Sequence, residues 1–179
     1  MSIVTRGGDR GETQLLYGGR VAKDDRRTEA YGALDEAISA MGLARALSTR
    51  EETRALLLAL QREAFTVGAE LATGKDARDR LLAHFPTLGP DAADRLEAQV
   101  HELEARHPLP ASFVLPGGTT AAAALDLART VVRRAERRAV SVERAGELGN
   151  REVLRYLNRL SDLLFMLARV EEGPATTLK

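Results

Sequence analysis

Hydrophobic residues recur every three or four positions over long stretches of the chain, a spacing that places them on one face of an α-helix. The first such stretch begins near Asp24 and Asp25 and continues to about Leu47; its apolar positions are Ala30, Leu34, Ile38 and Met41. The two aspartates lie where carboxylates stabilise the positive end of a helix dipole. The pattern therefore predicts an amphipathic first helix over about residues 24–47.

The same periodicity predicts four more helices. Pro108 and Pro110 follow the third helix and end it, because proline cannot continue the backbone hydrogen-bond ladder. Thr119 or Thr120 is a suitable N-cap for the fourth. A connector with Pro86 and Pro90 separates the second helix from the third. We expect an all-α fold, an up-and-down five-helix bundle with a four-helix core, whose later helices cover about residues 48–74, 91–106, 119–143 and 150–170.

Residues 5–21 differ from the rest, because they are rich in glycine and polar side chains and have no helical period. They are predicted to form an extended or mobile loop, and no segment of the chain is typical of a strand. A chain of 179 residues is long enough for one sizeable core. We therefore expect a single domain over residues 1–179, with an N-terminal loop (1–22) and a helical bundle (24–170).

The charge balance excludes some classes of function. The 26 basic and 26 acidic residues give a formal net charge of zero, which argues against binding to nucleic acid. With no cysteine, disulfides and thiolate metal sites are excluded. The N-terminus has no signal-peptide pattern and no apolar run is long enough for a membrane span. A cytoplasmic protein without membrane contact is expected.

The fourth predicted helix carries a cluster of arginines. Positions i, i+4, i+7 and i+8 share one helix face, and the residues so placed are Arg129, Arg133, Glu136 and Arg137. Three arginines on one face repel one another unless anions lie between them, and forked guanidinium donors suit phosphates. Arg134 and Arg138 fall on the flank, where an ordinary solvated charge remains an equally good interpretation.

Two other segments carry candidate chemistry. In the fifth helix, one stripe contains Asn158, Asp162, Phe165 and Arg169. In the N-terminal loop, glycines would let backbone N–H groups approach an anion, although the loop lacks the Gly-Lys-Ser/Thr ending of a Walker A motif. Taken alone, each of these signals is weak.

Together, the segments resemble the PduO-type corrinoid adenosyltransferases. The matching segments are Thr5-Arg6, Gly8-Asp9 with Gly11 and Thr13, Lys23-Asp24-Asp25, Glu29-Ala30-Tyr31-Gly32 with Leu34-Asp35-Glu36, Phe113 with Leu115-Pro116-Gly117-Gly118, Ala128-Arg129, Arg133-Arg134-Ala135-Glu136-Arg137-Arg138, and Leu157-Asn158-Arg159-Leu160-Ser161-Asp162 with Phe165 and Ala168-Arg169. Several motifs in one order are more specific than any of them alone. The chain departs from the family pattern at Gly7, where threonine is usual, and at Glu12, a carboxylate in a loop expected to meet phosphates.

The resemblance implies a homotrimer with active sites between subunits. ATP would lie between the N-terminal loop of one subunit and the fourth helix of its neighbour, in contact with Thr5, Arg6, Gly7, Gly8, Asp9, Gly11, Thr13, Lys23, Arg133, Glu136, Arg137 and Asn158. Asp35 would pair with Arg129 across the interface. Phe113, Asp162 and Phe165 would face the corrinoid, with Phe113 keeping the lower axial position of cobalt apolar and empty.

The implied reaction transfers the 5′-deoxyadenosyl group of ATP to cob(I)alamin and releases triphosphate. Asp35, Phe113 and Arg129 are the residues expected to support it. Mg²⁺ on the phosphates would help to spread the charge of the leaving group. A flavoprotein-type reductase would supply electrons, and an adenosylcobalamin-dependent enzyme would accept the product.

Two alternatives belong to other classes. Glu104 and His107 have the Glu-x-x-His spacing of a di-iron bundle, but such sites need two of these motifs and further glutamates. A non-catalytic protein that delivers or senses adenosylcobalamin would use the same pocket, and the sequence alone leaves that possibility open.

Overall fold

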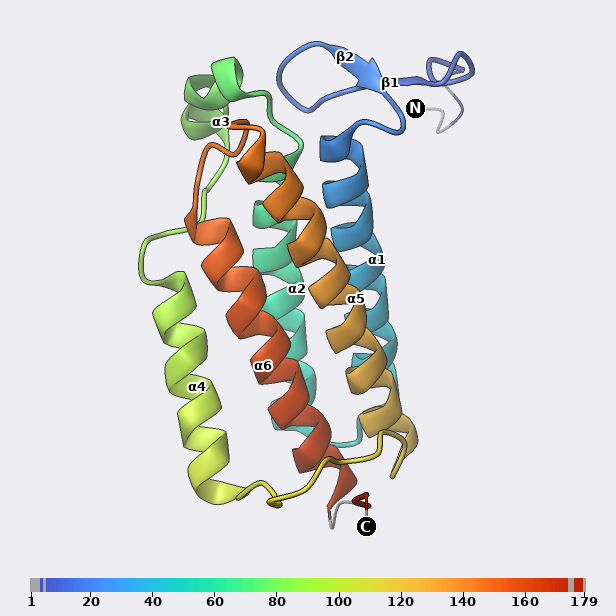
Figure 1. Cartoon of the computed structure of the whole chain (residues 1–179), viewed down its shortest axis with the longest axis vertical. Coiled ribbons are helices and arrows are strands. Elements are labelled where there is room, and N and C mark those ends of the chain that lie inside the picture. Colours follow the sequence, from blue (N-terminus) through green and yellow to red (C-terminus); the bar gives the residue numbers. More distant parts are fainter. Residues whose placement is uncertain (1–3, 5, 174–175, 179) are drawn as a thin grey trace.

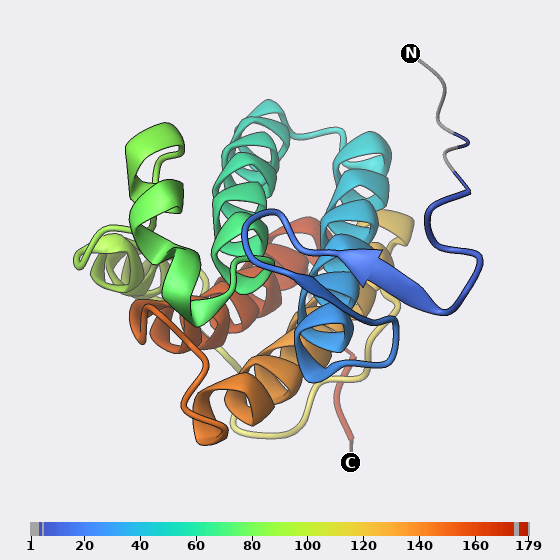
Figure 2. The ribbon, with the colours of Figure 1, turned by 90° about the horizontal axis from the view of Figure 1, so that it is seen from above.

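The computed structural model describes residues 4, 6–173 and 176–178. In this part of the chain the helices are α1 (Arg26–Leu47), α2 (Glu51–Leu71), α3 (Arg78–His84), α4 (Ala92–Arg106), α5 (Thr120–Arg144) and α6 (Glu152–Glu172), with a 3₁₀ turn at Lys75–Ala77. The long helices run side by side, as Figures 1 and 2 show. A mostly helical fold was predicted correctly, and the five long helices match the predicted positions within a few residues.

The prediction did not include α3. This seven-residue helix lies within the segment expected to be an irregular connector, between α2 and Pro86. Leu81 is its one buried side chain, at 1% exposure. A single buried position sets no helical period, so the pattern could not reveal a helix this short.

The N-terminal segment also differs from the prediction, because it contains two strands. β1 (Glu12–Gln14) and β2 (Arg20–Ala22) pair antiparallel, with Thr13 opposite Val21. Each strand has three residues, which is too short for an alternating pattern to be recognised. The expectation of no strand was therefore wrong, and the segment is a β-hairpin.

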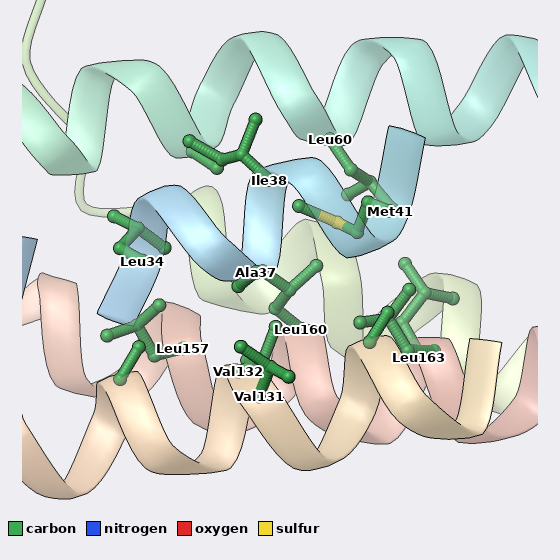
Figure 3. Packing of buried hydrophobic residues seen from close by; sticks show 14 of the residues in the cluster. Leu34, Ala37, Ile38, Met41, Leu60, Val131, Val132, Leu157, Leu160 and Leu163 are labelled. Atoms are coloured by element: carbon green, nitrogen blue, oxygen red, sulfur yellow. The ribbon is translucent and has the colours of Figure 1, made fainter. Parts of the chain in front are cut away.

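The core lies between α1, α2, α5 and α6, and buried residues of α4 extend it along α6. Leu34 and Ala37 of α1 point toward leucines of α6 and valines of α5, and Met41 lies beside Leu60 of α2 (Figure 3). Alanine at many α5 positions lets that helix approach α1 closely, and Ala128, Ala135 and Ala139 are completely buried. The apolar stripes thus face inward, and the charged faces of α5 and α6 remain available for a site.

A buried arginine joins three elements at the end of the bundle that carries the hairpin. Arg27, 4% exposed, donates from Nη1 to the carbonyl oxygens of Leu71 (3.2 Å) and Thr73 (2.8 Å). Its Nη2 donates to the carbonyl oxygen of Glu147 at 2.5 Å. Burial lowers the pKa of Arg27, and the nearby Glu147 carboxylate partly offsets that effect. The start of α1 is thereby tied to the end of α2 and to the loop between α5 and α6.

Backbone hydrogen bonds hold the hairpin at the same end. Leu16 N–H donates to the carbonyl oxygen of Ala72 (3.0 Å), and Gly74 N–H donates to that of Tyr17 (2.7 Å). The hairpin therefore lies at the end of α2, over the start of α1 (Figures 1 and 2).

Candidate functional site

Helix α5, which carries the predicted cluster of arginines, begins at a capped N-terminus. Thr119 Oγ1 accepts a hydrogen bond from Ala122 N–H at 3.1 Å, so the predicted N-cap is confirmed. About four turns further on, Arg133 and Arg137 are exposed, and neither guanidinium has an ion-pair partner among the described residues. Glu136 accepts a hydrogen bond from Asn158 Nδ2 at 3.1 Å. These four predicted ATP residues therefore lie close together where α5 meets α6.

The flanking arginines, Arg134 and Arg138, differ from Arg133 and Arg137 because they have carboxylate partners. Arg134 forms an ion pair with Glu36, and Arg138 Nη2 lies 3.2 Å from Glu29 Oε2, both carboxylates belonging to α1. Their charges are thus balanced within the chain. The contrast separates Arg133 and Arg137, which are available to an external anion, from two arginines that brace α5 against α1.

A groove of about 270 Å³ lies between α4, α5 and α6. It brings together four predicted site residues: Arg129, Arg133, Asp162 and Phe165. Cation–π contacts place the Arg129 guanidinium carbon 5.8 Å from the centre of the Phe165 ring. The groove therefore combines an aromatic surface with cationic groups.

Sequence reasoning missed one wall of this groove. Helix α4 contributes Glu97, Val100, His101 and Glu104 to the lining. His101 Nδ1 lies 3.1 Å from Glu104 Oε2. The α4 pattern indicated a compatible helix, and its one motif, Glu104 with His107, was considered only as an alternative di-iron site.

Sequence reasoning also missed the partner of Arg129. Asp126, 3% exposed, accepts from Arg129 Nε at 3.3 Å. Asp35 lies elsewhere, on the rim of an apolar groove of about 540 Å³ between α1 and α2, and no ion pair or hydrogen bond to it is found among the described residues. The expected Asp35–Arg129 pair does not form within one chain.

The hairpin brings several predicted ATP residues together, apart from Thr5, which lies outside the described residues. Lys23 N–H donates to the carbonyl oxygen of Gly11 (2.8 Å), and Gly11 has φ +79°, which glycine adopts without strain. A Cβ on Gly8 would lie 2.9 Å from Lys23 Nζ. The glycine at position 8 thus lets the lysine lie directly against the loop.

Glu12 is neutralised inside the hairpin. Its Oε2 accepts from Arg20 Nε at 3.1 Å, and Arg20 Nη2 donates to the carbonyl oxygen of Gly7 at 2.8 Å. This carboxylate, unexpected in a loop that meets phosphates, therefore shapes the loop through Arg20. Arg6, Asp9 and Thr13 belong to the same segment, Arg6 with φ +55°.

The hairpin and the α4–α5–α6 groove lie on different faces of the chain. Lys23 lines a separate hollow with Glu29, Glu36 and the flanking arginines of α5. None of the described hairpin residues lines the groove that holds Arg129 and Arg133. One chain does not bring the two halves of the predicted ATP site together.

Phe113 is 82% exposed and belongs to the loop before α5. This loop lies at the opposite end of the bundle from the hairpin (Figure 1). The carbonyl oxygen of Phe113 accepts from Leu178 N–H (2.9 Å), and Leu115 N–H donates to the carbonyl oxygen of Thr176 (2.8 Å). It does not line the α4–α5–α6 groove. The C-terminal residues therefore hold the backbone of this loop while the ring stays open to solvent.

Among residues 4, 6–173 and 176–178, no group of three or more His, Asp or Glu side chains could hold a metal ion. Nor, over the same residues, is any helix long and apolar enough to cross a membrane.

Known proteins of one family are similar to this chain over most of its length. A family model described as cobalamin adenosyltransferase matches residues 3–171. The corrinoid adenosyltransferase PduO of Salmonella typhimurium is 44% identical over 180 residues, which cover 98% of this chain but 51% of that protein. The corrinoid adenosyltransferase of Citrobacter freundii is 42% identical over 95% of this chain and 94% of that protein, and that of Bacillus subtilis is 42% identical over 95% and 86%. The chain thus spans about half of the first relative and most of the other two.

Solved structures show the same fold. A variant PduO-type ATP:corrinoid adenosyltransferase from Lactobacillus reuteri, complexed with cobalamin and ATP, has a TM-score of 0.91, 33% identity and 99% coverage of both chains. Another variant of that type from the same organism, complexed with ATP, has a TM-score of 0.88 at 33% identity, with 99% of this chain and 100% of that chain covered.

Proposed function

The chain belongs to the cobalamin adenosyltransferase family, and on that basis we propose that it transfers the 5′-deoxyadenosyl group of ATP to the cobalt of cob(I)alamin. One observation carries the proposal. Arginines without a carboxylate partner in the described chain, Arg133 and Arg137, lie beside the groove that holds Phe165 and Arg129. Phosphates and the face of a flat, largely apolar ring system are the ligands that such a surface suits.

The reaction places few demands on protein side chains. Cobalt(I) supplies the electron pair that forms the Co–C5′ bond, the C5′–O bond of ATP breaks, and triphosphate leaves with that bonding pair. The protein must orient the two substrates and stabilise the charge of the leaving group. Arg133, Arg137 and Lys23 would do the latter, together with Mg²⁺ carried on the phosphate oxygens.

We assign the active site to the boundary between neighbouring subunits of a homotrimer. The location of the hairpin and the α4–α5–α6 groove on different faces supports this assignment. So does Asp35, which is exposed at the rim of an apolar groove where Phe65 is 64% exposed. A neighbouring subunit would cover that groove and bring Asp35 to Arg129. In the shared site, residues Thr5 to Thr13 would wrap the nucleotide, with Glu136 and Asn158 completing its contacts.

The corrinoid would lie beside Arg129 and Phe165, with Asp162 at its edge and Phe113 at its lower axial face. An apolar ring at that face excludes a fifth ligand. Since a four-coordinate cobalt(II) accepts an electron more readily, Phe113 would ease its reduction to cobalt(I). A flavoprotein-type reductase would supply the electron, and an adenosylcobalamin-dependent enzyme would receive the product.

Anaerobic incubation of the purified protein with ATP and pre-reduced cob(I)alamin tests the function directly. The corrinoid absorption spectrum reports adenosylcobalamin, and phosphorus NMR reports triphosphate, with one molecule of each expected per turnover. Binding of both substrates without transfer would refute the enzyme and favour a protein that delivers or senses adenosylcobalamin.

A further inference from the structure

A buried ion network lies beneath the groove. Both carboxylate oxygens of Asp126 are used: Oδ1 accepts from Arg129 Nε (3.3 Å) and Oδ2 accepts from Arg169 Nη2 (2.6 Å). Asp126 is 3% exposed and Arg169 is 6% exposed, so water screens this contact little. One carboxylate thus fixes two arginines from different helices.

The network continues to the loop that carries Phe113. Arg169 Nε lies 3.0 Å from Glu172 Oε2, an ion pair whose N–H is not aligned for a hydrogen bond. The other oxygen, Glu172 Oε1, accepts from Gly118 N–H at 3.1 Å. Since a Cβ on Gly118 would lie 2.4 Å from Glu172 Cγ, only glycine permits this approach.

A second bond reinforces the same junction. Thr119 Oγ1, at the start of α5, donates to the carbonyl oxygen of Glu171 (3.3 Å). The last turn of α6 therefore holds the loop at the point where it becomes α5. Figure 1 shows this loop and the end of α6 at the same end of the bundle.

Phe165 lies where the network meets the groove. The guanidinium carbon of Arg169 is 5.0 Å from the centre of its ring, and that of Arg129 is 5.8 Å from it. Two cations that share one carboxylate thus flank the ring, so a shift of either moves the surface that the groove presents.

We propose that Asp126, Arg169 and Glu172 form a buried positioning network that aligns Arg129, Phe165 and the Phe113 loop for the corrinoid. None of the three is assigned a contact with substrate; they act through the residues that they hold. The proposal rests on the proposed function, because its readout is the formation of adenosylcobalamin.

The decisive variants are Asp126→Asn, which keeps the shape of the side chain, and Arg169→Lys, which keeps its charge. Each breaks the contact between residues 126 and 169. Each is expected to lower kcat/KM for cob(I)alamin by about tenfold or more, the effect of losing one positioned contact, while the KM for ATP changes less than about twofold. Arg27→Lys is the matched control, an equally buried arginine at the other end of the bundle. It is expected to lower the unfolding temperature while both kinetic constants, measured well below that temperature, stay within about twofold.

A double-mutant cycle separates positioning from plain loss of stability. If Asp126 acts through Arg129, then Asp126→Asn added to Arg129→Ala lowers kcat/KM by less than about twofold further. Full multiplication of the two effects would overturn the proposal. A rise in the KM for ATP as large as the loss in kcat/KM for cob(I)alamin would overturn it as well. So would a loss of stability with unchanged kinetic constants.

Gly118→Ala tests the loop end without altering any charge. The new methyl group must displace Glu172, and we expect the same selective loss toward cob(I)alamin. Gly149→Ala is its control: a Cβ there would lie 2.7 Å from Nη1 at the end of the long Arg78 side chain, and normal kinetics are expected. Wild-type kinetics in Gly118→Ala would contradict the network, whereas an inactive wild-type protein would refute the proposed function itself.

Discussion

Replacing one arginine at a time distinguishes the phosphate-binding face of α5 from its flank. Arg133→Ala removes an exposed guanidinium that has no ion-pair partner in the described chain, and Arg134→Ala removes one that is paired with Glu36. Neither substitution leaves a buried charge or a cavity. Arg133→Ala is therefore expected to change the free energy of unfolding by about 0.5 kcal/mol or less, and Arg134→Ala by about 1 kcal/mol or less. The unfolding temperature then shifts by about 4 °C at most.

Their effects on ATP should differ strongly. A hydrogen bond to a charged group contributes about 1.5–3 kcal/mol, so its loss in Arg133→Ala weakens ATP binding about 10- to 150-fold. The Arg134–Glu36 pair is exposed and worth about 1 kcal/mol at most, and its loss should leave ATP binding within about twofold.

Isothermal titration with ATP in the presence of Mg²⁺ measures both dissociation constants, with thermal unfolding recorded alongside. Equal weakening in the two variants would mean that ATP is attracted by the overall charge of α5. Unchanged binding in Arg133→Ala would remove this residue from the site and refute the reasoning.

Three further predictions concern other parts of the chain. Phe113→Ala should impair turnover from cob(II)alamin with a reductase far more than turnover from pre-reduced cob(I)alamin; equal losses in the two assays would contradict its axial role. Thr119→Ala should cost about 1 kcal/mol in urea unfolding, because Ala122 N–H loses its cap, and an unchanged midpoint would dispute this. Burial raises the pKa of the Tyr156 hydroxyl well above its usual range. Since unfolded tyrosine ionises near pH ~10, stability should fall as the pH rises above that value, by up to about 1.4 kcal/mol per pH unit for this group, and less steeply in Tyr156→Phe. The free energy of unfolding can be measured in urea between about pH 9 and 11, on either side of ~10. The same dependence on pH in the wild type and in Tyr156→Phe would argue against this assignment.

The sequence predicted the long helices well because their burial follows the helical period. Leu34 and Met41, spaced seven residues apart, are both completely buried. The Thr119 cap was also predictable, since its hydroxyl acts on a residue three positions away. Features set by fewer residues, such as α3 and the three-residue strands, left no period to detect.

The site was predicted less evenly, because long-range contacts decide it. Arg133 and Arg137 were separated from the flank only in part, since the carboxylates that balance Arg134 and Arg138 lie on α1, about a hundred residues away. Asp126 was missed, although an aspartate one turn before Arg129 within an alanine- and leucine-rich stretch was a usable signal.

The central claim is that one active site is built from the hairpin of one subunit and α5 of the next. Lys23→Ala and Arg133→Ala damage opposite halves of such a site, so each variant alone should form adenosylcobalamin slowly. Unfolding the two together and refolding them as a mixture gives trimers in which about a quarter of the sites combine an intact hairpin with an intact α5. We predict that the mixture regains about a quarter of the wild-type rate, while each variant refolded alone keeps only its own slow rate. A mixture no more active than the average of its two parents would contradict the shared site.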